Sequence, residues 1–255
     1  MKKILFPLSD LGQSTKSTIL KSVSAQLTKE GVLHSKSDAD NDHLSFYTSL
    51  AEKNAKGEIL TKQDSISGCA KIDFNSPEEI LNTTGLDTDI NIIDTPGRAI
   101  DVVSKSMGDV GIFLNAFSTL NSVPYILTTY IDKDKSPKTL HKLDEIFGNV
   151  TLDNDAKIHI IIVLNTGFIH SNNKNNLNDI VAAYNKDVSI ESMKANPRFV
   201  IHEIEFKTQL NTITKELVST KSITDILNGS VEPVTKVLLM GLLNDASKIT
   251  KILNS

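Results

Sequence analysis

The sequence predicts an α/β fold in which helices cover both faces of one doubly wound, mainly parallel sheet. Short apolar runs, typical of buried strands, alternate along the chain with segments of helical periodicity. The chain has 255 residues, a length that one α/β sheet commonly reaches, and we expect a single domain over residues 1–255. Hydrophobic residues make up 39% and charged residues 23%, which is typical of a globular protein and excludes a disordered chain.

The first elements are expected to be a strand, a polar loop and a helix. The strand is the apolar run Lys3–Leu8, and the loop over Ser9–Thr15 consists mostly of small and polar residues. The helix ends at Gly31, because glycine is favoured just after the last helical turn. Its apolar face consists of Ile19, Leu20, Val23 and Leu27. A weaker strand over Val32–Ser37 leads into the acidic cluster 38–42.

The segment between this cluster and the next buried strand is less regular. We expect a helix over Leu44–Ala55 and a strand or hairpin within Glu58–Phe74. Ser76 and the proline after it have the pattern of an N-cap and the first residue of a helix. Ile90–Ile93 is a buried strand that ends at Asp94.

The second half of the chain continues the alternation. Its expected helices lie over Ile100–Met107, over Ser136–Phe147, through Ala183 and, at the end, over about Val234–Leu253. Its expected strands lie over Gly111–Phe117, Tyr125–Ile131, Ile158–Leu164 and Phe199–Phe206. An Asn-rich loop is expected over Ser171–Asp179. In such sheets ligands bind outside the carboxyl ends of the strands, so these ends are the places to search for a site.

The loop before the first helix has the composition of a phosphate site. A helix N-terminus presents free backbone N–H groups and the positive end of the helix dipole, which attract anions. Lys16 would reach the β- and γ-phosphates, Ser17 would offer a hydroxyl to Mg²⁺, and Thr18 would contact the inner phosphate. Asp10 and Thr15 stand at the two glycine positions of the pattern G-x-x-x-x-G-K-[ST], so the alternative is a polar turn before a helix that carries a lysine.

Polar residues follow three further strands. Asp94 is placed to hold Mg²⁺ through water, or else to cap a turn. Asp40 is placed to orient an attacking water or join the Mg²⁺ shell, unless 38–40 is an exposed acidic loop. Asn165 is placed to bond a purine or to form a turn. Together these strand ends favour a nucleotide site. Its expected nucleotide-binding residues are Gly12, Gln13, Ser14, Thr15, Lys16, Ser17, Thr18 and Asn165.

These residues resemble the deviant Walker-type P-loop ATPases of the ParA/MinD group, which segregate plasmids or position division proteins. The match runs in order from Lys3 to about Asn165, and beyond that only the helix–strand–helix pattern agrees. The resemblance implies a P-loop NTPase-like domain and ATP held between two subunits. It also implies Lys16 and Asp40 as catalytic residues, on the phosphates and near the attacking water respectively. It further implies Ser17, Asp40 and Asp94 as residues that serve Mg²⁺, with Asp94 in its second shell.

The loop departs from the pattern of that group. Leu11 stands where the signature lysine belongs, and Gln13 and Thr15 replace glycines. Loss of the signature cation removes a stabiliser of the transition-state charge, which predicts slow hydrolysis, a substitute cation or a switch that barely turns over. Arg98 is the candidate substitute, and the alternative is an ordinary surface arginine at a helix start.

Three hypotheses about function follow. The first is a ParA/MinD-like homodimer that binds ATP, hydrolyses it slowly and acts with a stimulating or recruiting partner in plasmid partition, mobilisation or conjugative transfer. The second is a catalytically impaired nucleotide-binding scaffold of the same fold, and the third is a P-loop enzyme that phosphorylates or reduces a small molecule. ATP is favoured over GTP, because Asn165 is followed by Thr-Gly-Phe-Ile, with no carboxylate at the spacing that reads guanine.

Other partners have weaker support. The net charge of −4 makes nonspecific DNA binding a weak expectation. No apolar run approaches the ~18 residues of a membrane helix, and we expect a cytoplasmic protein. In the last helix, an apolar stripe suits core packing better than a membrane surface: Leu238, Leu242, Ala246, Ile249 and Leu253. The single cysteine, Cys69, is expected to be a packing residue, and the six histidines lack zinc-ligand spacing.

Overall fold

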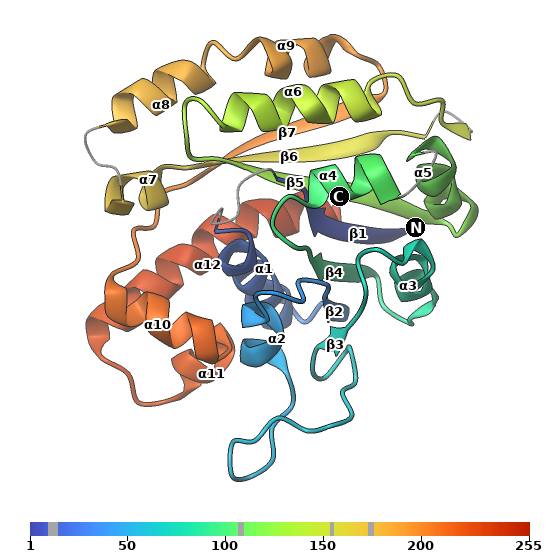
Figure 1. Ribbon diagram of the computed structural model, residues 1–255. Helices are drawn as coiled ribbons and strands as arrows, with labels where there is room; N and C mark the ends of the chain where they lie inside the picture. The colour runs from blue at the N-terminus through green and yellow to red at the C-terminus, as the bar shows by residue number, and fades with distance from the viewer. Residues whose placement is uncertain (10–14, 107–109, 154–155, 173–175) are drawn as a thin grey trace.

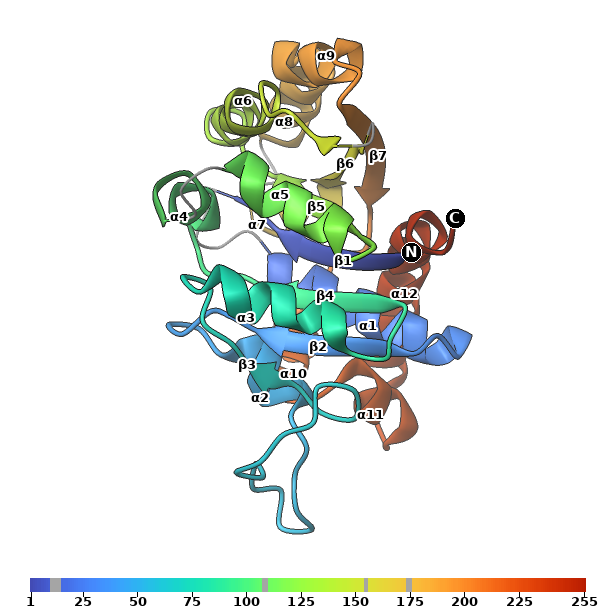
Figure 2. The same ribbon diagram turned by 90° about the vertical axis from the view of Figure 1, so that its right-hand side faces the viewer.

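The computed structural model describes residues 1–9, 15–106, 110–153, 156–172 and 176–255. Within these ranges seven strands form one sheet in the order β3-β2-β4-β1-β5-β6-β7, and each neighbouring pair is parallel. The strands are β1 (Lys2–Pro7), β2 (His34–Asp38), β3 (Ala70–Lys71), β4 (Ile90–Asp94), β5 (Ser122–Tyr130), β6 (Ile158–Asn165) and β7 (Phe199–Phe206). The predicted doubly wound parallel sheet is confirmed (Figures 1 and 2).

Helices pack on both faces of the sheet. Buried side chains on one face come from α1 (Lys16–Glu30), α2 (Ser45–Leu50), α10 (Thr212–Thr220), α11 (Ile223–Asn228) and α12 (Pro233–Asn254). On the other face they come from α3 (Pro77–Asn82), α4 (Ala99–Ser106), α5 (Val110–Thr119), α6 (Ser136–Phe147), α7 (Thr166–Asn172), α8 (Leu177–Tyr184) and α9 (Val188–Ala195). A short 3₁₀ helix, η1 (Thr83–Gly85), follows α3.

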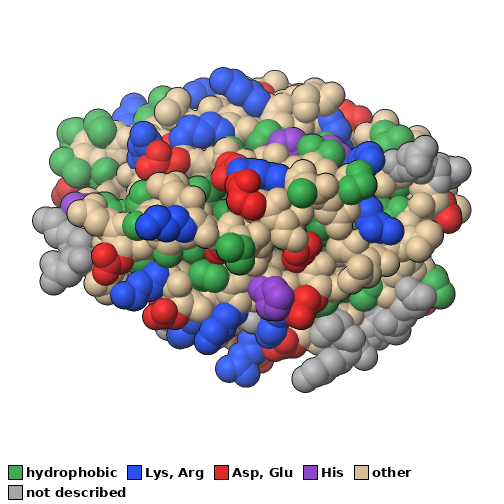
Figure 3. All heavy atoms as spheres, turned by 90° about the horizontal axis from the view of Figure 1, so that it is seen from above, with side chains coloured by type: hydrophobic (Ala, Val, Ile, Leu, Met, Phe, Trp, Pro, Cys, Tyr) green, Lys and Arg blue, Asp and Glu red, His purple; other side chains and the backbone are tan. Residues whose placement is uncertain are grey.

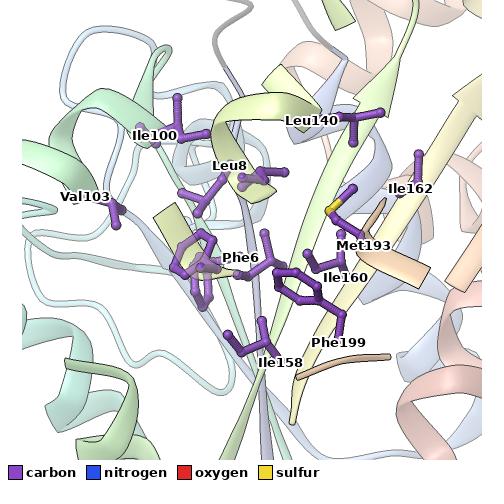
Figure 4. Packing of buried hydrophobic residues seen from close by; sticks show 14 of the residues in the cluster. Phe6, Leu8, Ile100, Val103, Leu140, Ile158, Ile160, Ile162, Met193 and Phe199 are labelled. Carbon is purple, nitrogen blue, oxygen red and sulfur yellow. The ribbon is translucent and has the colours of Figure 1, made fainter. Parts of the chain in front are cut away.

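The strands are buried on both sides, as the apolar runs predict. Ile160 and Ile162 of β6 pack with α6 and α9 on one face, whereas Ile161 and Val163 pack toward α12 on the other. Successive side chains of a strand point to opposite faces, so a strand covered by helices on both sides is apolar at almost every position. Figure 4 shows the first of these two cores, with Phe6, Leu8 and Phe199 beside the β6 isoleucines.

The chain adds strands first to one side of β1 and then to the other. The strands β4, β2 and β3 lie on one side of β1, and β5, β6 and β7 lie on the other. β1 therefore ends at a topological switch point, and in open α/β sheets ligands bind in a crevice outside the carboxyl ends of the strands at such a point. The Thr95 hydroxyl, just after β4, donates a hydrogen bond to the Pro7 carbonyl at the end of β1.

One strand prediction is wrong. The segment Gly111–Phe117 lies within the helix α5 and not in a strand. Phe113, Leu114 and Phe117 are buried against the sheet, while Ile112 is 72% exposed. This one-sided burial at helical spacing explains the helix, because a short apolar run does not distinguish a buried strand from a buried helix.

Other boundaries also differ from the predictions. The helix expected over Leu44–Ala55 ends at Leu50, and beyond it a single antiparallel bridge joins Lys53 to Ile59. Within the segment expected to hold a strand or hairpin, only β3 is a strand. The Asn-rich loop expected from Ser171 begins inside α7, which ends at Asn172. Met107, the expected end of the helix over Ile100–Met107, lies outside the described residues.

The C-terminal helix α12 packs against α1 and β7, so the expected core packing is confirmed. Its buried stripe contains Leu242, Ala246, Ile249 and Leu253 as expected, with Leu239 in place of the partly exposed Leu238. In the described part of the chain, no helix has both the length and the apolar character that a membrane crossing requires.

The outer surface of the layer formed by α6, α8 and α9 carries charges of both signs. Figure 3 shows lysine and arginine side chains interspersed with aspartate and glutamate over this face. Several form ion pairs, such as Lys133 with Asp179 at 3.7 Å and Lys194 with Glu191 at 3.1 Å. Exposed pairs of this kind contribute roughly 0–1 kcal/mol each, so this layer is held mainly by its apolar face.

His34, at the start of β2, is buried in its neutral form. Its Nδ1–H donates to the Val32 carbonyl at 2.9 Å, which leaves Nε2 to accept from the Ser24 hydroxyl at 2.8 Å. Burial lowers the pKa of His34 to about 4, and the neighbouring Lys36 acts in the same direction. Neutral imidazole therefore forms part of the packing between α1 and the sheet.

This burial predicts acid sensitivity. The unfolded chain takes up a proton on His34 near pH 6.5, whereas the folded protein does so only near pH 4, so the free energy of unfolding falls as the pH decreases from about 6.5 to 4. Between pH 7.5 and 5 we expect His34 to account for a loss of roughly 2 kcal/mol. His34→Gln should lose correspondingly less stability over this range in urea unfolding. Identical pH slopes for the variant and the wild type would contradict the burial of a neutral imidazole.

Candidate functional site

The carboxyl edge of the sheet brings together the described residues that the sequence indicates for binding nucleotide or Mg²⁺. These residues are Thr15, Lys16, Ser17, Thr18, Asp40, Asp94 and Asn165. The other expected nucleotide-binding residues, Gly12, Gln13 and Ser14, lie outside the described residues, as do Asp10 and Leu11.

Lys16 is a buried cation at the first turn of α1. The residue is 5% exposed, and its Nζ donates to the backbone carbonyls of Thr95 at 3.3 Å and Pro96 at 2.9 Å. Burial lowers the pKa of Lys16, while the charges of Asp94 and Asp40 act in the opposite direction. The ammonium group therefore lies between the N-terminus of α1 and the turn after β4, and it ties these two segments together.

Two carboxyl groups lie side by side at this edge, because Asp38 of β2 and Asp94 of β4 are register partners. The Ser17 hydroxyl donates to Asp94 Oδ2 at 2.5 Å. Burial raises the pKa of Asp94 to about 6, although Ser17 and Lys16 oppose this shift. Burial and the nearby Asp94 charge raise the pKa of Asp38 to about 7. This pair is an acidic centre whose charge favours a cation.

Asp40 belongs to the same centre, and most of its side chain is buried. Its charge acts on both Lys16 and Asp94, and its Oδ1 accepts from the backbone N–H groups of Asp42 and His43, each at 3.1 Å. The carboxylate thus shapes the turn that leads from β2 toward α2, and the 38–40 segment is buried where an exposed acidic loop was the alternative.

Thr15, immediately before α1, has left-handed backbone geometry with φ 60° and ψ 8°. This is the position at which the phosphate-loop pattern has glycine, and a non-glycine residue pays about 1–2 kcal/mol for this conformation. The backbone therefore keeps the geometry that the glycine would provide, although the side chain differs.

Asn165, at the end of β6, uses its amide within the protein. Its Nδ2 donates to Thr15 Oγ1 at 3.0 Å, and its Oδ1 accepts from the backbone N–H of Phe168 at 3.0 Å. The second bond caps the N-terminus of α7, since Asn is one of the favoured capping residues. Asn165 therefore links α7 to the start of α1 and caps α7, while purine binding by its side chain stays a prediction.

A cavity of about 320 Å³ opens beside these residues, between the start of α1 and α7. Its walls include Thr15, Thr18 and Asn165 together with Phe168 and Thr208. Apolar side chains of Ile19, Phe206, Leu210 and Leu242 complete the walls together with the polar side chains of Ser171, Asn172 and Lys215. The cavity thus combines aromatic and apolar surface with several polar groups, as small-molecule sites do. The Nζ of Lys215 lies 6.0 Å from the centre of the Phe168 ring.

No motif in the sequence indicates Lys21 as part of the site. This lysine is buried on α1, and its Nζ donates to the Val218 carbonyl of α10 at 2.9 Å. Burial lowers its pKa to about 8, and the charges of Asp94 and Asp38 oppose that shift. The available signal was a lysine directly beside Ile19 and Leu20, within the apolar pattern of the helix. The cavity residues Phe168, Thr208 and Lys215 had no such signal, because they come from separate segments of the chain.

Arg98, the candidate substitute cation, is exposed on the turn that precedes α4. Its backbone is left-handed, with φ 62°, and its carbonyl accepts from Asp101 N–H at 2.9 Å.

The residues present fit a phosphate chain and Mg²⁺. The first turn of α1 contains no acidic residue, and the side chain of Thr15 at its cap position makes no hydrogen bond to the helix. The positive end of the α1 dipole therefore favours an anion here. Ser17 with Asp94 behind it is a donor set suited to Mg²⁺, which takes one or two protein ligands and completes its shell with phosphate oxygens and water. Within the described ranges, no cluster of three or more His, Cys, Asp and Glu side chains could hold a metal ion by itself.

The seven-stranded parallel sheet, covered by helices on both faces, is a doubly wound α/β fold whose candidate site lies at its carboxyl edge. No protein-family model matches the sequence, and a search of curated proteins returns no match. Solved structures do match, among them the MinC:MinD cell division complex of Aquifex aeolicus, at 10% identity and a TM-score of 0.52, over 98% of this chain and 96% of that chain. The pNOB8 ParA matches at 12% identity and a TM-score of 0.52, over 99% and 100% of the two chains.

A second structure, pNOB8 ParA bound to nonspecific DNA, matches at 13% identity and a TM-score of 0.54, over 98% of this chain and 99% of that chain. This chain therefore has the ParA/MinD type of P-loop ATPase fold over nearly its whole length, as the resemblance in its sequence implies. At such low identity the likeness concerns the fold alone.

The left-handed geometry at Thr15 predicts that Thr15→Gly is more stable than Thr15→Ala, the opposite of the order at an ordinary position. Thr15→Gly and Thr15→Ala both lose the hydroxyl that accepts from Asn165, so they differ only in backbone preference. We expect the glycine variant to be the more stable by about 1 kcal/mol, because glycine adopts positive φ without cost. At an ordinary position alanine is favoured, so an alanine variant of equal or greater stability in urea unfolding would exclude the left-handed conformation.

Proposed function

We propose that this chain binds ATP with Mg²⁺ at the carboxyl edge of its sheet and acts as a ParA/MinD-like nucleotide-dependent switch. The observation that carries the proposal is the buried Lys16 at the start of α1, beside the Ser17–Asp94 pair and the 320 Å³ cavity. A buried ammonium group, a helix N-terminus without an acidic first turn and a hydroxyl that donates to a carboxylate together suit a triphosphate with Mg²⁺. An adjoining cavity with aromatic walls suits a nucleobase.

Each residue has a defined part in this proposal. Lys16, with the loop residues Gly12, Gln13 and Ser14, would hold the phosphates, and Thr18 would contact the inner phosphate. Ser17 would bind Mg²⁺ directly and Asp94 through water, and the ion would neutralise phosphate charge when bound. Asp40 would orient water near the γ-phosphate. Asn165 would act by fixing the cavity wall to Thr15.

The cellular part of the proposal rests on the resemblance and the fold. We infer a cytoplasmic homodimer that meets a stimulating or recruiting partner protein in plasmid partition, mobilisation or conjugative transfer. ParA of pNOB8 was solved on nonspecific DNA, and the same fold makes DNA a candidate ligand here, although the net charge of −4 is unfavourable for it. Turnover measured beside affinity separates a slow ATPase from a scaffold that binds ATP without hydrolysing it.

Lys16→Ala tests the phosphate site. We expect at least a tenfold loss of ATP affinity by calorimetry, about 1.4 kcal/mol, because the ammonium group would no longer meet the phosphates. Lys36→Ala is the matched control: Lys36 is also a buried lysine on a backbone carbonyl, that of Ile66, but it lies on β2 away from the carboxyl edge. Equal ATP affinity in the wild type and Lys16→Ala, or absence of ATP binding by the wild type, would refute the proposal.

Ser17→Ala tests the metal. The wild type should bind ATP more tightly with Mg²⁺ than with a chelator present, and the variant should lose most of this difference, because it lacks the hydroxyl that faces Asp94. Thr18→Ala provides a neighbouring hydroxyl deletion that should keep the Mg²⁺ dependence. If Ser17→Ala retains the full Mg²⁺ effect in the same titration, the metal is held elsewhere.

A further inference from the structure

The connection from β7 to α10 forms one wall of the 320 Å³ cavity. β7 ends at Phe206 and α10 begins at Thr212, and between them Thr208 and Leu210 line the cavity. Leu242 of α12 lines the same side. This part of the wall is thus a loop, whose position depends on its contacts with the neighbouring helices.

Asp245 of α12 holds this segment by hydrogen bonds. The residue is 3% exposed, and its Oδ2 accepts from Lys207 N–H at 2.9 Å, Thr208 N–H at 2.9 Å and the Thr208 hydroxyl at 2.8 Å. Its Oδ1 accepts from Lys248 Nζ at 2.9 Å. Hydrogen bonds to an ionised acceptor are about twice as strong as neutral ones, so a buried carboxylate with four donors is a firm anchor.

Two glycines enclose the same threonine. A Cβ on Gly167, at the start of α7, would lie 2.2 Å from the Thr208 carbonyl oxygen. A Cβ on Gly241 of α12 would lie 3.0 Å from the Thr208 hydroxyl. Neither glycine has a positive φ, so the reason for glycine here is space. Thr208 is therefore packed between α7 and α12 with no room to shift toward either helix.

The helix that carries Asp245 also packs along α1, whose N-terminus carries Lys16 and Thr18. Thr18 and Thr208 line the same cavity. One rigid helix thus sets the position of the cavity wall relative to the phosphate end of the site.

We infer that Asp245 is a positioning residue for nucleobase binding, through its hold on Thr208. The inference rests on the proposed function. It assigns Asp245 a role in binding the base but not the phosphate chain, because its hydrogen bonds fix only the cavity wall. Asp245 therefore influences the difference in affinity between a nucleotide and the same phosphate chain without a base.

The test compares ATP with inorganic tripolyphosphate, which has the phosphate chain and no base, both with Mg²⁺. Asp245→Asn keeps the shape of the side chain but leaves one neutral acceptor oxygen. The three hydrogen bonds from residues 207 and 208 lose their ionised acceptor, and the bond from Lys248 is lost because an amide NH₂ cannot accept it. We expect Asp245→Asn to weaken ATP binding by about fivefold or more and to leave tripolyphosphate binding unchanged, because only the base wall is loosened. Gly241→Ala should act in the same direction by pressing on the Thr208 hydroxyl, and it decides the question if Asp245→Asn fails to fold.

The matched control is Asp187→Asn. Asp187 is likewise a buried carboxylate, which accepts from the Tyr130 hydroxyl and the Ser189 N–H, but it lies at the start of α9 and does not line the cavity. Asp187→Asn should change neither the affinity for ATP nor the affinity for tripolyphosphate. Equal loss of ATP and tripolyphosphate affinity in Asp245→Asn would mean a merely structural role, and wild-type ATP affinity in both cavity variants would equally overturn the inference. A wild type that binds neither ligand would instead refute the proposed function itself.

Discussion

Compensation of buried charge at the carboxyl edge of the sheet is the constraint on which this structure depends. Parallel pairing places Asp38 and Asp94 next to each other, and α1 brings Lys16 and Lys21 toward them. Burial alone would drive each carboxyl group toward its neutral form and each lysine toward its neutral amine. The charge of Lys16 opposes that shift at Asp94, and the aspartate charges oppose it at both lysines. At Asp38 the opposing groups are the backbone N–H groups of Tyr47 and Asp40.

This arrangement connects segments that are far apart along the chain. Lys16 reaches the turn after β4, Ser17 reaches Asp94, and Asn165 reaches Thr15. A group bound at the N-terminus of α1 would compete for the same donors and acceptors. The turn after β4 and the start of α7 would then shift when such a group binds, because Lys16 contacts the first and Thr15 contacts the second.

Thr15, just before α1, has a left-handed backbone although it is not a glycine. Thr15 adopts the left-handed conformation that glycine adopts more easily, and its hydroxyl gains a hydrogen bond from Asn165 that glycine could not accept. The hydrogen bond offsets part of the conformational cost. At this one position, therefore, a threonine can adopt the left-handed conformation that glycine adopts more easily.

The sequence by itself indicated a doubly wound parallel sheet and most of its strands, because each strand buried on both faces is a continuous apolar run. It also indicated Lys16, Ser17, Asp40 and Asp94, which belong to local patterns around strand ends. It failed at Gly111–Phe117, since a short apolar run carries no period long enough to separate helix from strand. Only the tertiary structure decided the pairing of Asp38 with Asp94, the capping role of Asn165 and the wall that Asp245 holds. These features depend on contacts between distant segments, which local sequence patterns do not encode.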